Sequence, residues 1–433
     1  MATSVSLSNP DTPAALAPVA PGERVFGFTQ HLSLWFSLGV GLLVMQVGAY
    51  LVPAVGPRDA LMAIILGSVI GAGLLAWTAK LGADSGLTSA GLMHLTYGSL
   101  FAKLPIILNI VQLVGWTTFE LVVMRDGTAA IAKQSLGLDL SGWGGIVAST
   151  ALWGAVLCAL IAASMLTTVR KLIGKFALPL VVVSLVWLTW QFGGQIAAKG
   201  FDAFWNNPGK GGMGLLSAMD LVIAMPVSWL PLIADYARHG KDGKGALQGT
   251  WLGYALANIW CYALGVMIVS VATPGTDLVT ALLLAQGGLI ALGFILFDEI
   301  DNAYGDVYSG AVNSHSLLAQ WSIRQWGFAI AVACSVLALF LPMHSIEPFL
   351  LLLSSVFVPL YGVILGRLAT RDFSGPSNAR LGHGKINPTA AVLWVAGIVL
   401  YHTLAKFAPQ LGSALPTLAF TFVLAWATRP QPA

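Results

Sequence analysis

The stretch Phe297-Asp-Glu-Ile-Asp-Asn-Ala-Tyr-Gly-Asp306 places four carboxylates between two segments that lack Asp, Glu, Lys and Arg, Leu282–Leu296 and Val307–Leu318. An acidic side chain at the centre of a membrane-spanning helix costs roughly 2.5–3.5 kcal/mol on insertion scales. Such side chains are tolerated where they face a cavity and bind a ligand or ion. The stretch therefore predicts a membrane helix that lines a site in a transporter or channel, with a cargo that contacts carboxylates.

The composition of the whole chain agrees with a membrane protein. Of its 433 residues, 57% are hydrophobic and 9% are charged, whereas soluble domains carry about 25% charged residues. The expected fold is an all-α, multi-pass membrane protein with twelve transmembrane helices, each about 20 residues long. The expected spans are 31–54, 59–82, 101–124, 144–166, 171–193, 214–234, 246–272, 279–306, 325–342, 346–367, 387–405 and 411–428.

Lys and Arg are distributed unevenly over the connections between these spans. One set of alternate connections holds 15 of the 21, and the other set holds 6. Because basic loops remain in the cytoplasm, we expect both termini to be cytoplasmic and the protein to lie in the inner (plasma) membrane. Residues 1–24, rich in Pro, Ala and Ser, are expected to form a disordered cytoplasmic tail. The basic loops indicate contact with lipid headgroups rather than with nucleic acid.

Two of the spans carry residues that interrupt helices. Gly39 and Gly41 lie near the middle of the first span, and Pro226 and Pro231 lie inside the sixth. Glycine weakens a helix interior, and proline removes a backbone donor. Interrupted helices at matching positions of two halves are a sequence signal for a transporter site, where freed carbonyl groups coordinate a cation. The Cys and His residues show no metal-ligand spacing, and no nucleophile motif indicates an enzyme.

The third span carries Gln112, Trp116 and Glu120 on one helix face, because they are spaced i, i+4 and i+8. A ring-shaped cargo could stack on Trp116 while Glu120 binds its edge. Two alternatives stay open: Trp116 packs against lipid or a helix, and Glu120 pairs with Arg125. Asp235, which ends the sixth span, is expected to form an ion pair or helix cap with Arg238.

In the eighth span, Asp298, Glu299, Asp301, Asn302 and Asp306 spread over about 160° of the helix. One face cannot direct all of them to one point. Glu299 and Asp301 lie at opposite edges of this arc, so we expect them to face different neighbours. Asp306 lies one turn beyond Asn302.

The chain resembles the nucleobase:cation symporter-1 family, which includes cytosine permeases and hydantoin transporters. The resemblance covers about residues 25–430 and rests on the order of several motifs. They are Trp35-Phe-Ser37, Asp84-Ser-Gly-Leu-Thr88, Trp116 with a polar residue at i+4, Asp235-Tyr-Ala-Arg238 and Asn302…Ser309-Gly310. It implies the leucine-transporter fold, with two inverted five-helix repeats (25–200 and 201–370), broken helices 1 and 6, and two further helices in 371–433. It also implies cation-coupled uptake of a small heterocyclic substrate without a cofactor.

The resemblance also implies site residues. Trp116 matches the stacking tryptophan, and Glu120 falls where a hydantoin transporter has a glutamine. Gly41, Ser228 and Asn302 match substrate contacts, while Pro226 replaces a second aromatic residue for which Trp229 could substitute. Gln112 and Asp306 complete the expected substrate-binding set.

A cation, Na⁺ or H⁺, is expected at a second group of residues. In sodium-coupled members it is held by first-span carbonyls, here those of Ser37 and Val40, and by two hydroxyl residues of span 8. Ile300 and Asp301 occupy those hydroxyl positions. Asp301 could bind Na⁺ more strongly than a hydroxyl, or carry a proton, and Asp298 is the next candidate. Apart from this Na⁺, no metal is expected.

The string Asp298-Glu-Ile-Asp-Asn-Ala-Tyr304 is similar to one subgroup, the proposed hydroxymethylpyrimidine transporters linked to uptake of thiamine precursors. An aminopyrimidine fits this prediction, because its exocyclic amine and a protonated ring nitrogen match a carboxylate with two hydrogen bonds. A cytosine or purine permease is the alternative within the same class, and a channel is the alternative from another class.

Overall fold

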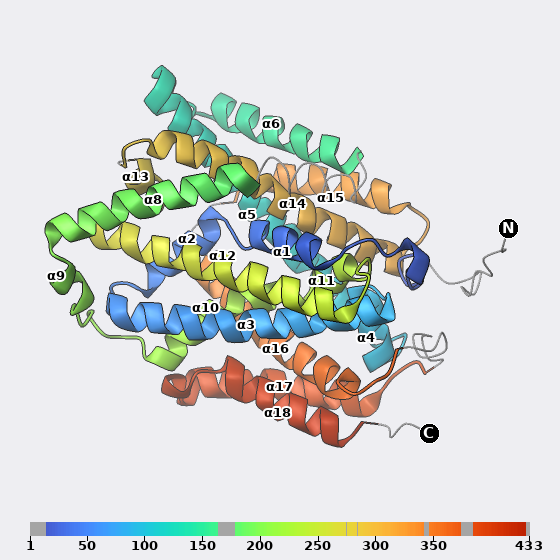
Figure 1. Ribbon diagram of the computed structural model, residues 1–433. Helices are drawn as coiled ribbons and strands as arrows, with labels where there is room; N and C mark the ends of the chain where they lie inside the picture. The colour runs from blue at the N-terminus through green and yellow to red at the C-terminus, as the bar shows by residue number, and fades with distance from the viewer. Residues whose placement is uncertain are drawn as a thin grey trace.

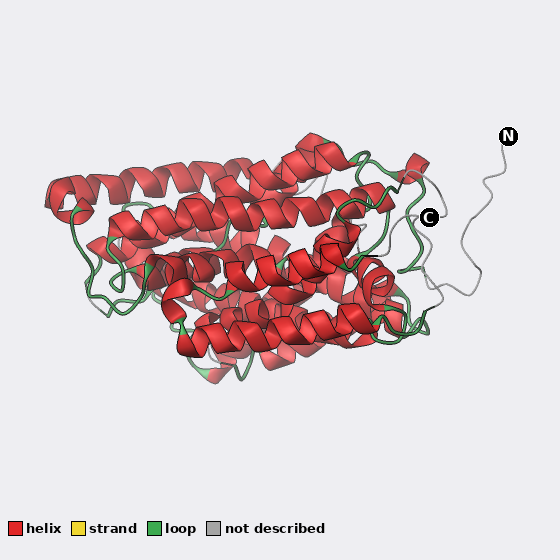
Figure 2. Cartoon of the chain, turned by 90° about the horizontal axis from the view of Figure 1, so that it is seen from below, coloured by secondary structure: helices red, strands yellow, loops and turns green. Residues whose placement is uncertain are grey.

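The computed structural model describes residues 14–162, 178–273, 275–283, 285–341, 346–373 and 384–429. In these residues the regular elements are helices (Figures 1 and 2), with one isolated β-bridge between Phe26 and Gly240. The α-helices are α1 Phe28–Ser37, α2 Leu42–Leu51, α3 Pro57–Ser85, α4 Ser89–Tyr97, α5 Lys103–Leu136, α6 Trp143–Ala162, α8 Leu178–Lys199, α9 Phe201–Trp205, α10 Leu215–Ser228, α11 Leu230–Ala237, α12 Gly243–Val271, α13 Leu278–Leu283, α14 Gly288–Leu317, α15 Ile323–Leu337, α16 Ile346–Leu368, α17 Pro388–Phe407 and α18 Ala414–Ala427.

The helix lengths agree with a multi-pass membrane protein. By length and composition, eight of the described spans could cross a membrane, or nine if α1 and α2 count as one bent span. The acidic stretch lies in α14, which is 30 residues long, while α15 and α18 are shorter apolar helices. Every expected span corresponds to one of these helices or broken pairs, although residues 163–177 and 342–345 lie outside the described part.

The boundaries of the eighth span were predicted wrongly. Instead of one helix over 279–306, the chain forms the short α13 and then α14, which continues to Leu317. The interruption occurs because Gly287 adopts a left-handed conformation (φ 72°), which other residues rarely adopt. The acidic stretch consequently lies in the middle of a long helix rather than at its end.

The first span is broken where the glycines predicted it. The axes of α1 and α2 differ by 63° across the segment between Ser37 and Leu42. Gly39 has no room for a side chain, since a Cβ would lie 2.8 Å from the Cβ of Ala257 and 3.1 Å from the carbonyl oxygen of Trp35. The break and its close approach to α12 therefore depend on glycine.

The sixth span is interrupted more mildly. Helix α10 ends at Ser228 and α11 begins at Leu230, with Trp229 between them. Pro226 lacks the N–H that would bond to the carbonyl oxygen of Val222, and the Tyr262 hydroxyl donates to that oxygen instead, at 3.0 Å.

The broken helices lie in the interior of the bundle. Helix α12 packs against α1, α2 and α3, helix α10 packs against α3 and α16, and α14 packs against α5. Helices α17 and α18 pack on α16 at the margin of the molecule (Figure 1). This arrangement brings the α1–α2 break, the α10–α11 break, α5 and α14 together.

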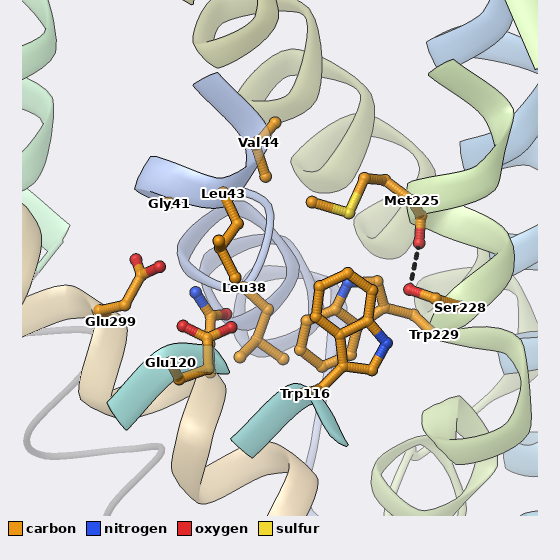
Figure 3. Close-up of a pocket in the computed structure, with 11 residues that line it drawn as sticks. Leu38, Gly41, Leu43, Val44, Trp116, Glu120, Met225, Ser228, Trp229 and Glu299 are labelled. Atoms are coloured by element: carbon orange, nitrogen blue, oxygen red, sulfur yellow. Dashed lines mark hydrogen bonds between the residues drawn. The ribbon is translucent and has the colours of Figure 1, made fainter. Parts of the chain in front are cut away.

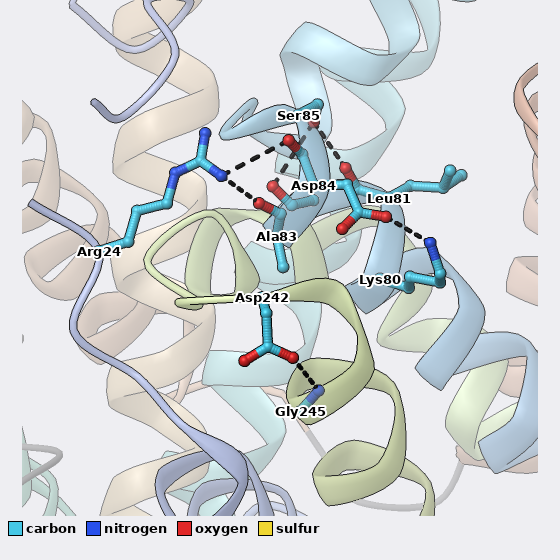
Figure 4. A network of polar contacts seen from close by, with 9 residues as sticks. Arg24, Lys80, Leu81, Ala83, Asp84, Ser85, Asp242 and Gly245 are labelled. Atoms are coloured by element: carbon cyan, nitrogen blue, oxygen red, sulfur yellow. Dashed lines mark hydrogen bonds and ion pairs between the residues drawn. The ribbon is translucent and has the colours of Figure 1, made fainter. Parts of the chain in front are cut away.

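Residues 14–24, expected as part of a disordered tail, instead contact the rest of the chain, while residues 1–13 lie outside the described part. Arg24 donates to the carbonyl oxygen of Ala83 at 2.6 Å (Figure 4). It also donates to the carbonyl oxygen of Val19 at 3.1 Å. Thr88 donates through its hydroxyl to the carbonyl oxygen of Ala15 at 2.8 Å. The segment is thus held against the connection between α3 and α4.

Candidate functional site

A small cavity lies where the two helix breaks meet α5 and α14 (Figure 3). Its free volume is about 20 Å³, which is room for about one water molecule. Binding of an organic ligand therefore requires the surrounding helices to move apart. The residues that line the cavity are Leu38, Gly41, Leu43, Val44, Trp116, Glu120, Met225, Ser228, Trp229, Glu299 and Asn302.

The structure brings six of the eight expected substrate-binding residues to this cavity. They are Gly41, Trp116, Glu120, Ser228, Trp229 and Asn302. The other two, Gln112 and Asp306, are buried but do not line it. Leu38, Leu43, Val44, Met225 and Glu299 line it without having been assigned to it.

Two tryptophans are held at the cavity by neighbouring rings. Trp116 packs edge-on against Phe349, with ring centroids 5.2 Å apart. Trp229 packs edge-on against Trp35, with centroids 5.8 Å apart. The indole N–H of Trp116 is buried and has no hydrogen-bond partner. Ring packing thus orients both tryptophans, and Trp116 keeps an unused donor.

Gln112 hydrogen-bonds to the backbone at the α10–α11 interruption. Its side-chain amide donates to the carbonyl oxygen of Ser228 at 3.0 Å and to Oδ1 of Asn109 at 2.8 Å. Asn109 in turn donates to the carbonyl oxygen of Pro231 at 2.8 Å. Polar residues spaced i and i+3 in the apolar α5 were the sequence signal for this pair, and Asn109 was missed. Together they bond carbonyl groups at the α10–α11 interruption.

Two carboxyl groups meet at the opposite side of the cavity. Those of Glu120 and Glu299 lie within hydrogen-bonding reach of each other, and Figure 3 shows both side chains beside the α1–α2 break. The alternative in which Glu120 pairs with Arg125 is wrong. Arg125 instead forms an ion pair with Asp126 at 2.7 Å and donates to the carbonyl oxygen of Ala338.

The residues expected to bind the cation also lie together. The Ser37 hydroxyl donates to Asp298 at 2.8 Å and lies 3.3 Å from Asp301. The carbonyl oxygen of Val40 accepts from the Asn302 side-chain amide at 3.0 Å. As the helical arc predicted, Asp301 and Glu299 face different neighbours. The α1–α2 break therefore separates a pair of aspartates from a pair of glutamates.

Asp235 does not form the expected ion pair with Arg238 and instead joins three helices. Its carboxylate accepts from the backbone N–H of Ser89 at 2.9 Å, from the Asn313 amide at 3.2 Å and from the Ser309 hydroxyl. It thereby caps the start of α4 and connects α11 to α14.

The family model described as "Permease for cytosine/purines, uracil, thiamine, allantoin" matches residues 18–428. No curated protein matches the chain at a significant level.

Solved structures of low sequence identity share the fold. One is Mhp1, described as a nucleobase-cation-symport-1 family transporter, in a closed conformation with bromovinylhydantoin bound. It is 18% identical over 98% of this chain and 95% of its own, with a TM-score of 0.80. Mhp1 in an inward-facing conformation is 16% identical over 98% and 92%, with a TM-score of 0.76. A Na⁺-coupled sialic acid symporter is 10% identical over 95% and 91%, with a TM-score of 0.63. The expected transporter fold is confirmed.

Proposed function

We propose, because this chain belongs to the family of permeases for cytosine and purines, uracil, thiamine and allantoin, that it couples a cation gradient to the import of an aminopyrimidine. Hydroxymethylpyrimidine or a related thiamine precursor is the proposed cargo. The observation that carries this choice is the buried carboxyl group of Glu120 beside the ring of Trp116 in one cavity (Figure 3).

The chemistry of Glu120 supports an amino-substituted ring. Its Oε2 is buried and accepts no hydrogen bond from the protein. A protonated ring nitrogen and the adjacent exocyclic amine present two parallel donors, and a carboxylate binds such an edge through charge-assisted hydrogen bonds. The ring would stack on Trp116 at the same time. Asn302 and Ser228 would contact the remaining edges.

Coupling is assigned to Asp298 and Asp301, with the Ser37 hydroxyl and the carbonyl groups of Ser37 and Val40. Oxygen ligands of this kind suit Na⁺, and a carboxylate buried without a cation favours its protonated form. Because both aspartates contact Ser37 at the end of α1, a change in their charge acts directly on the break. Na⁺ or H⁺ would thus control when the cavity opens.

A cytosine or purine permease is the second candidate. It is favoured by Asn302, whose buried Oδ1 lacks a partner and lines the same cavity. A side-chain amide can form hydrogen bonds with the edge of a neutral base. This candidate shares the cation coupling and differs only in the charge of its cargo.

A binding screen on the purified protein tests the proposal. Hydroxymethylpyrimidine, cytosine, adenine, uracil and hydantoin would be titrated while the tryptophan fluorescence is recorded. We expect the aminopyrimidine to bind most tightly. Uptake into proteoliposomes would then be measured with an imposed Na⁺ or proton gradient. Tightest binding of uracil or hydantoin, or uptake that does not saturate, contradicts the proposal.

A further inference from the structure

We propose that Glu299 is a second cargo-binding carboxylate, which together with Glu120 restricts the cargo to singly charged cationic heterocycles with N–H or O–H donors on two edges. This inference rests on the proposed function and narrows its substrate class. It concerns Glu299, which lies at the opposite edge of the polar arc of α14 from Asp301.

The two glutamates line the same cavity from different helices, Glu120 from α5 and Glu299 from α14. Glu120 is 4% exposed and Glu299 is fully buried. Oε2 of Glu120 and both carboxyl oxygens of Glu299 have no hydrogen-bond partner. Buried polar atoms are nearly always bonded. A proton shared between the two carboxyl groups would supply one donor, so at least one of these three oxygens is left for a donor from outside the chain.

The carboxyl group of Glu299 lies beside the start of α2. Its carboxylate faces the backbone N–H groups of Leu42 and Leu43 without closing a hydrogen bond to either. The N-terminus of a helix carries a partial positive charge that stabilises an anion. The start of α2 therefore suits a carboxyl group at this position, and the Glu299 oxygens remain available to a ligand.

Gly41 provides the space that Glu299 occupies. A Cβ at this position would lie 3.0 Å from Oε2 and 3.4 Å from Oε1 of Glu299, and 3.4 Å from Nδ2 of Asn302. Its φ of 168° is ordinary extended backbone, so conformation alone does not require glycine here. The absent side chain is what lets the carboxylate approach the break and the cavity.

The charge of the glutamate pair has no counterpart in the described part of the chain. The charged groups that act on Glu120 are Glu299, Asp306 and Asp298, all of them acidic. No described Lys or Arg forms an ion pair with either glutamate. Buried charges without a partner are costly. One proton shared between the glutamates and one positive charge on the cargo would neutralise the pair.

These constraints specify the chemistry of the cargo. A ring protonated next to an amino group binds Glu120 with that edge while it stacks on Trp116. A further hydroxyl or amino substituent next to that edge of the ring donates to Glu299, whose carboxyl group lies beside that of Glu120. A neutral oxo-pyrimidine such as uracil carries no positive charge, and beside each ring N–H it presents a carbonyl oxygen, which a carboxylate repels.

The test measures dissociation constants for hydroxymethylpyrimidine and uracil in the full-length detergent-solubilised protein. Glu299→Gln keeps the shape of the side chain and removes its charge. We expect it to weaken binding of hydroxymethylpyrimidine by about tenfold or more, since hydrogen bonds to charged groups are among the stronger ones, and to narrow its preference over uracil. Asp126→Asn, which removes an exposed charge from α5 outside the cavity, is the control and should change neither value.

Gly41→Ala is a second variant that retains both glutamates. It should weaken hydroxymethylpyrimidine binding several-fold, because the added Cβ would displace the Glu299 carboxylate. If Glu299→Gln does not fold, Gly41→Ala tests the role of Glu299 in its place. Unchanged affinity in folded Glu299→Gln, or in folded Gly41→Ala in its place, overturns the role of Glu299 and leaves the proposed function intact. Wild-type protein that binds uracil but not hydroxymethylpyrimidine overturns both.

Discussion

At the scale of single residues, Trp116 is the proposed stacking partner of a planar cargo. Stacking of a base on an aromatic side chain contributes roughly 1–3 kcal/mol in single-stranded nucleic-acid sites. We expect Trp116→Ala to weaken cargo binding by about 5- to 150-fold, and Trp116→Phe to retain much of the affinity. Titration calorimetry measures both. Unchanged binding in folded Trp116→Ala protein would remove the stacking role and leave Trp116 as a packing partner of Phe349.

Glu120 should decide between amino- and oxo-substituted rings. Glu120→Gln keeps the side-chain shape but replaces a carboxylate by an amide. Because hydrogen bonds to charged groups contribute roughly 1.5–3 kcal/mol, we expect aminopyrimidine binding to weaken by about tenfold or more, and uracil binding to change less. Competition titrations give both constants. An equal loss for all ligands, or no loss for any, assigns Glu120 a structural role.

Asp301 should separate binding from coupling. Its carboxylate lies 3.3 Å from the Ser37 hydroxyl at the end of α1, outside the cavity lining. We expect Asp301→Asn to abolish accumulation of cargo against its gradient while equilibrium binding or exchange persists, because the amide can neither take up a proton nor supply a full charge to Na⁺. Gradient-driven uptake into proteoliposomes measures the first, and titration measures the second.

The exposed Asp202 in α9 offers a control for this variant, and Asp202→Asn should accumulate cargo normally. In the native protein, dependence on Na⁺ identifies Na⁺ as the coupling ion, while Na⁺-independent uptake that a protonophore abolishes identifies H⁺. Full accumulation by Asp301→Asn moves the coupling role to Asp298.

At the scale of the element, the α10–α11 interruption depends on donors from α5. Removal of a donor that leaves a buried acceptor unpaired costs roughly 1–3 kcal/mol. Within membranes the contribution of one side-chain hydrogen bond is smaller and averages about 0.6 kcal/mol. We therefore expect Asn109→Leu and Gln112→Leu each to lower the melting temperature and to weaken cargo binding, through displacement of Ser228 and Trp229. Thermal unfolding and titration measure the two effects.

Thr403→Val is the matched control for Asn109→Leu and Gln112→Leu. The Thr403 hydroxyl also donates to a backbone carbonyl, that of Val399 at 2.7 Å, but it lies within a regular exposed helix. It should unfold and bind as the wild type does. If Gln112→Leu behaves like this control, the break is held by packing and not by its α5 donors.

At the scale of the whole molecule, the end of α18 and the packed residues 14–24 lie at the same end of the bundle (Figure 1). The basic connections hold 15 of the 21 Lys and Arg residues and predict that this end is cytoplasmic. Green fluorescent protein fused to the C-terminus should then fluoresce, and alkaline phosphatase fused there should be inactive. Reversed reporter signals would reverse the assigned orientation and with it the direction called import.

Local patterns predicted most features that depend on neighbouring residues, although the helix start at Gly287 was missed. Apolar length predicted the spans, Gly39 and Gly41 predicted the break in the first helix, and the 3.6-residue repeat predicted that Glu299 and Asp301 face different neighbours. A membrane imposes these features directly, because backbone groups in lipid must bond within their own helix and acids must face away from lipid.

Only the tertiary structure decided which partner each polar group finds. Gln112 shares a helix face with Trp116 and Glu120, yet it bonds to Ser228 because the interrupted α10–α11 span presents carbonyl oxygens there. Glu299 joins Glu120 because the break at Gly41 leaves room for its carboxylate beside α2. These contacts join residues more than a hundred positions apart, and the helix crossings that create them arise from packing of the whole bundle.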